Sequence, residues 1–194
     1  MIIVGLTGSI GMGKSTAAAM IRRLGIPVFD ADQAVHRLMA KGGRAVAPIA
    51  ARFPGVLADG AIDRRALGRA VFGQNAELKA LEAILHPMVH EAEQRFIRSV
   101  AFTRQGLVVL DIPLLFEGHR DLDCDVTIVV TAPAFLQRQR VLRRPGMTDE
   151  RLRQILALQM PDAEKRRRAD FVIQTGLGHA PALHQLKRIL RCLR

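Results

Sequence analysis

A glycine-rich stretch near the start of the chain has the residue types and the spacing that hold phosphate groups. Residues 8–15 read G-x-x-x-x-G-K-S, after the apolar run 2–6 and before the helix-prone run 16–21. A strand, a glycine loop and a helix in this order are what a P-loop requires. The glycines let successive backbone N–H groups turn towards a phosphate at the positive end of the helix. The stretch therefore predicts a polyphosphate site; the alternative is a plain connection between a strand and a helix.

The side chains of this loop indicate phosphoryl transfer from a nucleoside triphosphate. Lys14 is expected to reach the β- and γ-phosphates, and the hydroxyl of Ser15 is expected to ligate Mg²⁺. As a loop residue, Lys14 is expected to be exposed, so that its removal should change folding very little. The loop residues that we expect to bind ATP are Gly8, Gly11, Met12, Gly13, Lys14, Ser15 and Thr16.

Aspartates at the ends of two expected strands are candidates for metal binding and base catalysis. Asp111 closes a continuous apolar run, which is the layout of a Walker-B carboxylate that acts on Mg²⁺ directly or through water. A turn or capping role is the alternative for Asp111. Asp30 and Asp32 follow a short apolar strand, at the end where open α/β sheets bind ligands. Asp32 is the candidate that orients an attacking hydroxyl and accepts its proton, whereas capping of the next helix is the alternative for both residues.

Two arginines in the second half of the chain are candidates for stabilising a transferring phosphate. Arg140 and Arg144 are four residues apart, so on a helix they project from one face and can close over the phosphate. Arg138 and Arg143 are expected to face solvent. The basic run 165–168 is likewise expected to be a solvated surface.

One histidine pair has the spacing of metal ligands without the rest of the motif. His86 and His90 are four residues apart, but Pro87 follows the first and no glutamate completes H-E-x-x-H. We therefore expect no zinc site.

The composition favours anionic small molecules over nucleic acid. The 194 residues include 29 basic and 18 acidic ones, which gives a formal net charge of +11. There is no Trp and no Tyr, and only 8 Phe, so that stacking surfaces for RNA bases are scarce. A polyphosphate pocket suits this charge better, and we expect no nucleic-acid partner.

The cysteines and the apolar runs indicate a soluble, cytoplasmic protein. Cys124 and Cys192 follow no metal-ligand spacing, so we expect buried free thiols in a reducing compartment, with a disulfide as the alternative. We expect no signal segment, because the first apolar run lacks a basic flank and passes straight into the glycine loop, and the sequence has no apolar run of 18 residues. We expect no membrane partner and a monomer or weak homo-oligomer.

The hydrophobic pattern predicts an α/β fold with a parallel sheet. The expected strands are the apolar runs 2–6, 27–30, 107–112, 126–130 and 171–173. Residues 33–104 are expected to be mainly helical, with glycine-containing breaks and no buried strand. The stretch 135–160 is expected to be helical, with an interruption at 144–148 and a new helix start at Thr148. The tail 182–193 has one apolar stripe, as a packing helix does.

Several further motifs follow one another along the whole chain. They are Gly5-Leu6-Thr7-Gly8, Asp30-Ala31-Asp32, Ile62-Asp63-Arg64 followed by Leu67, His86-Pro87, Asp111-Ile112-Pro113-Leu114-Leu115-Phe116-Glu117, and Gln159 with Ala169-Asp170. In this order they resemble the dephospho-coenzyme A kinase family. The P-loop alone is shared by very many proteins, whereas this set is specific to few.

The resemblance implies ATP-dependent phosphorylation of the ribose 3′-hydroxyl of dephospho-coenzyme A, with Mg²⁺, as the last step of coenzyme A synthesis. It implies that Asp32 is the catalytic carboxylate, with Lys14, and that Arg140 is the arginine of a lid. Arg64, His86 and Glu117 are implied to bind or shape the acceptor site. Arg144 and Thr175 are counted with the ATP-binding residues, although the family commonly has Asn near the adenine where this chain has Gln174-Thr175-Gly176.

The resemblance also implies one P-loop kinase domain over residues 1–194, with a five-stranded parallel sheet flanked by helices. Three segments would form the core, one a helical substrate-binding region and one a helical lid. They are about 1–32, 105–134 and 161–194 for the core, about 33–104 for the substrate-binding region and about 135–160 for the lid.

Three other classes of protein share parts of this pattern. A P-loop GTPase needs N-K-x-D, but Asn75 is the only asparagine, and Leu114 occupies the glycine position of D-x-x-G. A nucleic-acid-binding ATPase would explain the charge but not the scarcity of aromatic residues. A shikimate-type or nucleoside monophosphate kinase is the runner-up, and it leaves the long helical insertion and the run 111–117 unexplained.

Overall fold

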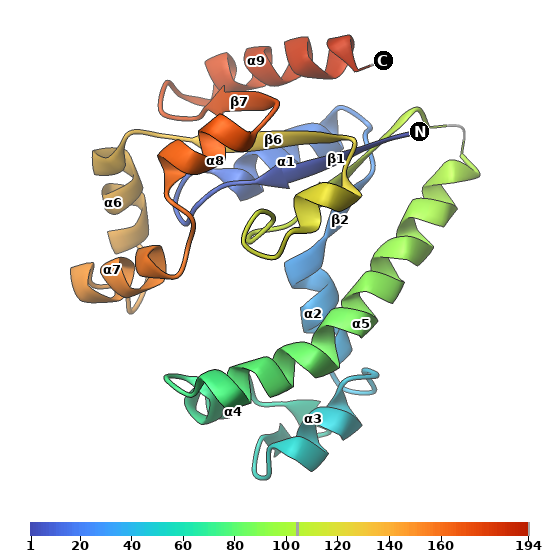
Figure 1. Cartoon of the computed structure of the whole chain (residues 1–194), viewed down its shortest axis with the longest axis vertical. Coiled ribbons are helices and arrows are strands. Elements are labelled where there is room, and N and C mark those ends of the chain that lie inside the picture. Colours follow the sequence, from blue (N-terminus) through green and yellow to red (C-terminus); the bar gives the residue numbers. More distant parts are fainter. Residues whose placement is uncertain (104, 194) are drawn as a thin grey trace. The chain divides into compact units, whose positions relative to one another are not determined.

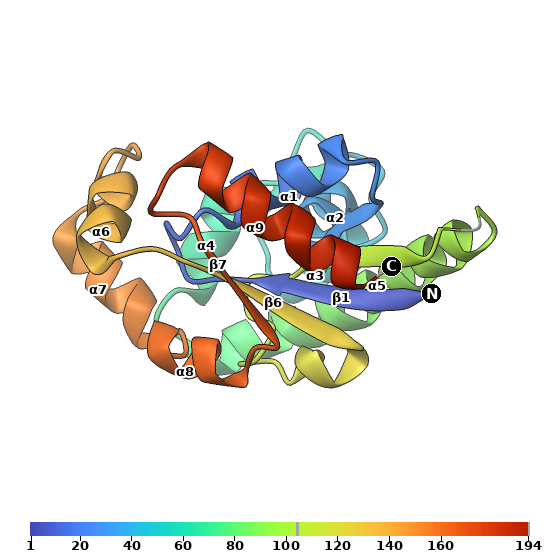
Figure 2. The same ribbon diagram turned by 90° about the horizontal axis from the view of Figure 1, so that it is seen from above.

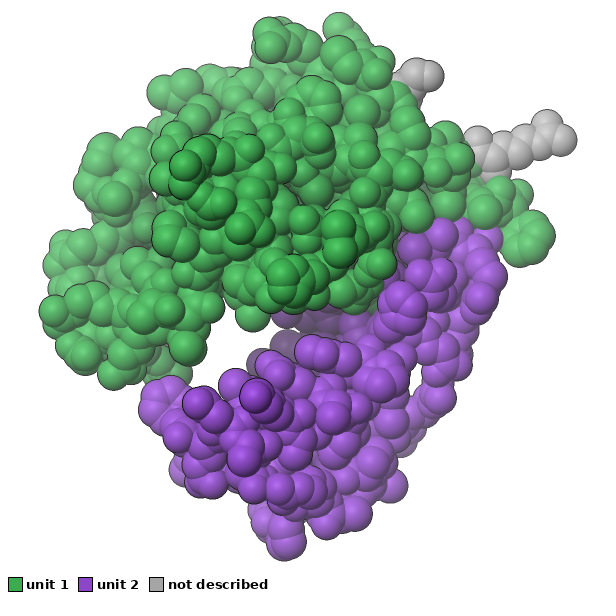
Figure 3. Space-filling view, viewed as in Figure 1, with its two compact units in different colours: residues 1–29, 100–194 green, residues 30–99 purple. Residues whose placement is uncertain are grey.

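A five-stranded sheet is the framework of the first of two units into which the chain divides (Figures 1 and 3). The computed structural model describes residues 1–103 and 105–193. Unit 1 comprises residues 1–29 and 100–194, and unit 2 comprises residues 30–99.

The sheet has the order β2-β5-β1-β6-β7, so that the chain begins in the middle of the sheet. β1 pairs in parallel with β5 and with β6, and β6 pairs in parallel with β7. The strands are β1 (Ile2–Thr7), β2 (Val28–Asp30), β5 (Leu107–Asp111), β6 (Val126–Thr131) and β7 (Phe171–Gln174). The expected five-stranded α/β architecture is confirmed.

Helices cover both faces of this sheet. α1 (Lys14–Arg23) and α9 (His179–Cys192) lie on one face, and α8 (Asp162–Arg168) lies on the other (Figure 2). Because successive strand residues point to opposite faces, every second apolar residue of a strand packs on α1 and α9. The buried strand residues of this core are Val4, Leu6, Leu107, Val109, Ile128, Val130 and Ile173.

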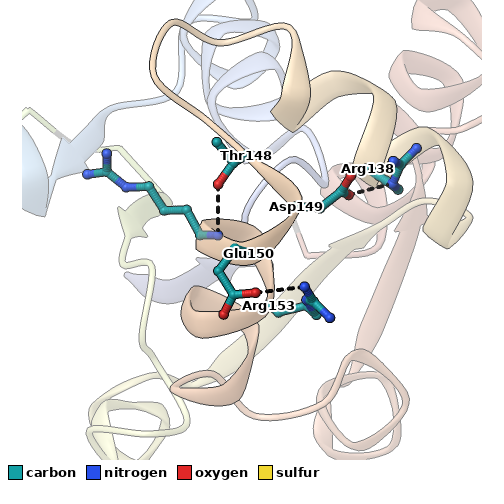
Figure 4. Close-up of polar contacts among 6 residues, drawn as sticks. Arg138, Thr148, Asp149, Glu150 and Arg153 are labelled. Carbon is teal, nitrogen blue, oxygen red and sulfur yellow. Dashed lines mark hydrogen bonds and ion pairs between the residues drawn. The ribbon is translucent and has the colours of Figure 1, made fainter.

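Two short helices follow β6 in unit 1. They are α6 (Ala134–Leu142) and α7 (Asp149–Ala157), with the expected interruption between them. Thr148 caps α7, because its hydroxyl accepts a hydrogen bond of 3.2 Å from Arg151 N. Arg138 of α6 donates two hydrogen bonds of 2.6 Å to the carboxylate of Asp149 and so joins the two helices. Figure 4 shows how these two side chains face each other. A short 3₁₀ helix, Arg120–Asp123, lies between β5 and β6.

Unit 2 is mainly helical, as expected. Its helices are α2 (Ala31–Met39), α3 (Val46–Arg52), α4 (Arg64–Val71) and α5 (Asn75–Ala101), the last of which extends two residues into unit 1. Buried apolar residues from these helices, among them Ile49, Leu67 and Leu85, form a second core. α5 is 27 residues long and contains Pro87. In the described part of the chain, no helix combines the length and the apolar character that crossing a membrane requires.

A small hairpin in unit 2 was not expected from the sequence. β3 (Leu57–Ala58) and β4 (Ala61–Ile62) pair antiparallel around Asp59 and Gly60, which have φ angles of +50° and +79°. Asp-Gly at the centre of a two-residue loop is a strong signal for such a hairpin. The sequence interpretation treated this dipeptide only as a break between helices.

The two cysteines form no disulfide in the part of the chain that the structure describes, as expected, but they are less buried than expected. Cys124 is half-buried and Cys192 is exposed. Cys192 is the last residue of α9.

The basic run 165–168 differs from the expectation at its first residue. Lys165 is 0% exposed, whereas the three arginines that follow it are exposed. Its Nζ lies 2.8 Å from Oε1 of Glu117, although this nitrogen has no partner with hydrogen-bond geometry among the described residues. The same Oε1 accepts a hydrogen bond of 2.8 Å from Met160 N. Burial of the lysine is possible because its charge faces a carboxylate, and no sequence pattern marked this pairing.

We expect the Lys165–Glu117 pair to stabilise the fold as a unit. Lys165→Met leaves a largely buried carboxylate unpaired, and Glu117→Gln keeps the acceptor for Met160 N but leaves a buried ammonium. Each change is expected to lower the free energy of unfolding by about 3 kcal/mol. The double variant should lose clearly less stability than the sum of the two single losses, as a double-mutant cycle with denaturant measures.

Arg167→Met, on the exposed face of α8, is the control and should change the free energy of unfolding by less than about 0.5 kcal/mol. Additive losses would contradict the pairing.

Candidate active site

The loop between β1 and α1 has the backbone geometry of a phosphate-binding loop. Gly11 and Gly13 have φ angles of +76° and +93°, in the left-handed region that favours glycine, and Gly13 is the N-cap of α1. A Cβ on Gly8 would lie 2.4 Å from Cγ2 of Val130, so the loop passes closely over β6. All three glycines of the loop are thus required by its shape.

Backbone donors of this loop remain available for a ligand. In residues 1–103 and 105–193, the N–H groups of Gly11, Gly13 and Lys14 donate to no protein acceptor. The positive end of the dipole of α1 adds to the attraction that these groups exert on an anion. Ser15 is exposed and Thr16 is half-buried on the first turn of α1.

Met12 can contribute only its backbone to ATP binding. Its side chain is buried in the core of unit 1, and its sulfur accepts a hydrogen bond of 3.1 Å from Ala132 N. This side chain anchors the loop to the end of β6.

Lys14 and Asp111 lie together at the end of the loop. Lys14 Nζ is 2.5 Å from Oδ1 of Asp111, whose side chain is 3% exposed. Asp111 is the last residue of β5 and stands opposite Leu6 of β1, which places its carboxylate beside the loop. The Lys14 side chain is only 14% exposed, so the expectation of an exposed lysine was wrong. The sequence could not show that Asp111 holds it.

Arg140 of α6 contacts the loop directly. Its Nη1 donates to Oγ1 of Thr175 at 3.1 Å and to the carbonyl oxygen of Gly11 at 3.4 Å, and its Nη2 donates to the carbonyl oxygen of Thr175 at 2.9 Å. The guanidinium is therefore fixed within reach of the phosphate loop. Arg138 points away from this loop and pairs with Asp149.

Arg144 does not share a helix face with Arg140, contrary to the expectation. α6 ends at Leu142, and Arg144 lies exposed in the turn that follows. Pro145 explains this end, because a residue before proline is disfavoured in helical conformation.

Thr175 lies under the P-loop. Its hydroxyl donates a hydrogen bond of 2.6 Å to the carbonyl oxygen of Met12. The carbonyl oxygen of Thr131 is a second acceptor at 3.2 Å, and the residue is 9% exposed. The hydroxyl is thus used within the protein. Glu117 likewise has protein partners, Lys165 and Met160 N.

The other expected site residues belong to unit 2. Asp30 caps α2, accepting a hydrogen bond of 2.9 Å from Gln33 N, while Asp32 is exposed in the first turn of the same helix. The two aspartates therefore have different roles, because Asp30 caps α2 and Asp32 does not. Arg64 and His86 are exposed on α4 and α5.

Asp63 fixes the start of the helix that carries Arg64. Its carboxylate accepts hydrogen bonds from the N–H groups of Arg65 and Ala66, at 2.8 and 3.3 Å. These bonds lower the pKa of Asp63 below its ordinary value, so that the cap is ionised at neutral pH.

Two glutamines that contact the P-loop were not found from the sequence. Gln137 and Gln159 each make a hydrogen bond with the backbone of Ile10. Gln159 had been quoted in the resemblance without a role, and Gln137 had no signal, because a polar residue on a short helix has no distinguishing local pattern.

The similarities of the chain to known proteins agree with this site. A family model described as Dephospho-CoA kinase matches residues 2–179. A dephospho-CoA kinase of Paramagnetospirillum magneticum is 63% identical over 194 residues, which cover 100% of this chain and 92% of that protein.

Solved structures extend the comparison to the fold. The crystal structure of TT1252 from Thermus thermophilus is similar over 100% of this chain and 98% of that chain, with a TM-score of 0.85 and 38% identity. A shikimate kinase from Acinetobacter baumannii covers 100% of this chain and 93% of its own, with a TM-score of 0.54 and 17% identity, a level that indicates a shared P-loop kinase fold alone. Because the family match covers nearly the whole chain, including the P-loop, Asp111 and Arg140, this chain belongs to the dephospho-CoA kinase family.

Proposed function

We propose that the protein transfers the γ-phosphoryl group of ATP to the ribose 3′-hydroxyl of dephospho-coenzyme A, giving coenzyme A and ADP. The observation that carries this proposal is the Lys14–Asp111 pair at a P-loop, in a chain that matches the dephospho-CoA kinase family over residues 2–179. The shared fold alone would leave shikimate-type and nucleoside monophosphate kinases open, because one fold can support many activities.

The P-loop would hold the phosphates of ATP without rearranging its glycines. Phosphoryl transfer has a loose transition state, so catalysis depends on positioning and on stabilising charge. The available N–H groups of Gly11 and Gly13 position the phosphates. Lys14, which Asp111 holds in place, stabilises the charge, because a cation that is fixed before the reaction does not have to reorient during it.

Mg²⁺ is the metal that we propose for this site. No three His, Cys, Asp or Glu side chains gather into a metal cage in the parts of the chain that the structure describes. A hydroxyl from Ser15 and a carboxylate from Asp111 fit Mg²⁺, which usually takes one or two protein ligands and completes its shell with phosphates and water. When bound, it neutralises charge on the phosphate oxygens.

Arg140 and Arg144 are proposed to act on the transferring phosphate. Arg140 is already anchored beside the loop, so that it would exchange carbonyl acceptors for phosphate oxygens. Such a charge on the equatorial oxygens is worth most in the transition state. We assign residues 135–160 as the lid on this basis.

Unit 2 is proposed to supply the acceptor side of the reaction. Asp32 is exposed and has no capping duty, so its carboxylate is available to orient the 3′-hydroxyl and accept its proton. Arg64 and His86, both exposed, are proposed to bind dephospho-coenzyme A. For Glu117 we propose a role in shaping the site, since its contacts are with Lys165 and Met160.

The setting of the reaction is also a proposal. A net charge of +11 suits two polyphosphate substrates. We propose that the protein works in the cytoplasm as a monomer or weak homo-oligomer, without a nucleic-acid or membrane partner.

A coupled assay for ADP release tests the proposed function. The purified chain is incubated with ATP and Mg²⁺ and with dephospho-coenzyme A, shikimate or a nucleoside monophosphate as the acceptor. Turnover is expected only with dephospho-coenzyme A, with phosphate at the 3′ position of the product. Faster turnover with either of the other acceptors would overturn the proposal.

Lys14→Met is expected to lower kcat by on the order of 10²-fold or more, because it removes a fixed cation at the developing charge. It should also lower the free energy of unfolding by about 1–3 kcal/mol, since the buried carboxylate of Asp111 loses its lysine. Lys14→Met with Asp111→Asn should regain stability without regaining turnover, because the double variant lacks both the cation and the carboxylate proposed for Mg²⁺. Recovery of kcat in the double variant would show that Lys14 acts only through folding.

Arg140→Ala should depress kcat far more than Arg138→Ala. The first change removes the guanidinium beside the P-loop, and the second removes only an exposed ion pair with Asp149, which contributes little to stability. Steady-state kinetics at saturating ATP measure both. Equal effects would mean that Arg140 has no role in the reaction beyond joining α6 to the loop.

Asp32→Asn keeps the shape of the side chain and loses its charge. If Asp32 positions and deprotonates the hydroxyl, kcat and kcat/KM should fall together by roughly 10²-fold. Asp30→Asn is the matched control, because asparagine can also cap α2. A rise in KM for dephospho-coenzyme A at unchanged kcat would reduce Asp32 to a binding residue.

A further inference from the structure

The P-loop contains a tight turn in which one residue, Ile10, is hydrogen-bonded by two glutamines. Met12 N donates to the carbonyl oxygen of Ser9 at 3.1 Å, which closes a four-residue turn with Ile10 and Gly11 in its centre. A φ angle of +76° at the third residue, Gly11, is the mark of a type II turn. Type I and type II turns differ by a flip of their central peptide, which here is the peptide between Ile10 and Gly11.

Gln137 of α6 donates a hydrogen bond to this central peptide. Its Nε2 donates to the carbonyl oxygen of Ile10 at 2.8 Å, and the residue is 6% exposed in α6. In a trans peptide the carbonyl and the N–H point in opposite directions. Fixing the carbonyl of Ile10 on α6 therefore aims the N–H of Gly11 away from α6, and that N–H is one of the available phosphate donors.

Gln159 holds the other side of the same residue. Its Oε1 accepts a hydrogen bond of 3.1 Å from Ile10 N, and it lies just after α7. The backbone partners decide the orientation of both amides, because a carbonyl requires a donor and an N–H requires an acceptor. The two ends of the α6–α7 segment thus bond to the N–H and the C=O of one loop residue.

We propose that Gln137 and Gln159 are positioning residues that set the phosphate-binding orientation of the P-loop and make it depend on the placement of the α6–α7 segment. They act through the backbone of Ile10, and neither is assigned a contact with substrate. α6 packs on the loop tightly enough for this, since a Cβ on Gly11 would lie 2.6 Å from Cγ2 of Val141. The inference rests on the proposed function for the acceptor, but its main measurement needs ATP alone.

Four variants test the proposal, with the affinity for ATP measured by calorimetry in the absence of acceptor. Gln137→Met and Gln159→Met each remove one bond to Ile10 and should weaken ATP binding about five- to tenfold. KM for ATP should rise by a similar factor, whereas KM for dephospho-coenzyme A should stay the same. Gln139→Met and Gln154→Met change exposed glutamines of α6 and α7 and are the controls, with wild-type affinity expected.

Two glutamate variants separate the bonds from mere packing. Gln159→Glu keeps an acceptor for Ile10 N, whereas Gln137→Glu loses the donor to the carbonyl oxygen of Ile10. Both add a negative charge beside Ile10, the first at its N–H and the second at its C=O, so Gln159→Glu should bind ATP better than Gln137→Glu by at least the factor seen for the methionine variants. If the Gln137 variants fail to fold, the proposal is tested by the affinities for ATP of Gln159→Met and Gln159→Glu alone.

Unchanged affinity for ATP in the methionine variants would overturn the proposal. An equal loss for ATP and dephospho-coenzyme A, in step with a fall in Tm, would also overturn it, because it would indicate a purely structural role. Measurements of ATP binding and of turnover on the wild-type protein distinguish a failure of this proposal from a failure of the proposed function. If it binds ATP but does not phosphorylate dephospho-coenzyme A, the proposed function fails while the glutamine comparison can still be read.

Discussion

The register of β1 against β5 is the constraint on which the phosphate site depends. Leu6 stands opposite Asp111, so β5 ends where β1 turns into the P-loop. Because the two strands are parallel neighbours, the carboxylate of Asp111 and the ammonium of Lys14 meet at 2.5 Å although 97 residues separate them. A slip of one residue would turn Asp111 to the opposite face of the sheet and break this pair.

The P-loop itself is held by groups that its own sequence does not contain. Its glycines permit the left-handed turns, but they do not choose among the conformations that glycine allows. That choice comes from outside the loop, since Thr175 bonds the carbonyl of Met12, Arg140 that of Gly11, and the two glutamines both sides of Ile10. The motif is therefore necessary for the loop, and the surrounding helices and strand ends make it rigid.

What the sequence could predict depends on how local each signal is. The P-loop, the buried strand before Asp111 and the helix start at Thr148 are marked by neighbouring residues, and all three lie as expected. The burial of Lys165 depends on Glu117, 48 positions away, and could not be read from a run of basic residues. The end of α6 before Arg144 had a local signal in Pro145, which the spacing argument had overlooked.

The structure explains what two residues of the motifs quoted for the family resemblance do. Asp170 accepts hydrogen bonds of 2.8 Å from both the N–H and the hydroxyl of Thr127, which ties the start of β7 to β6. Asp63 caps α4 and so fixes the helix on which Arg64 stands. Such residues act by positioning others, so their own chemistry does not mark them in the sequence.

The charges of the α6–α7 segment divide into a solvent side and a loop side. On the solvent side, the pair of Arg138 with Asp149 lowers the pKa of Asp149 and raises that of Arg138, mainly through their hydrogen bonds. Because the pKa of Asp149 is lower in the folded state, the pair stabilises the fold above the ordinary aspartate range near pH 4, and this contribution is lost as the pH falls through the lowered value. Such an exposed pair contributes little at any pH. The segment is instead joined to the P-loop by the partly buried bonds that Arg140 and Gln137 donate to the carbonyl oxygens of Gly11 and Ile10. By linkage, a ligand that favours this geometry of the loop would also favour this placement of the segment.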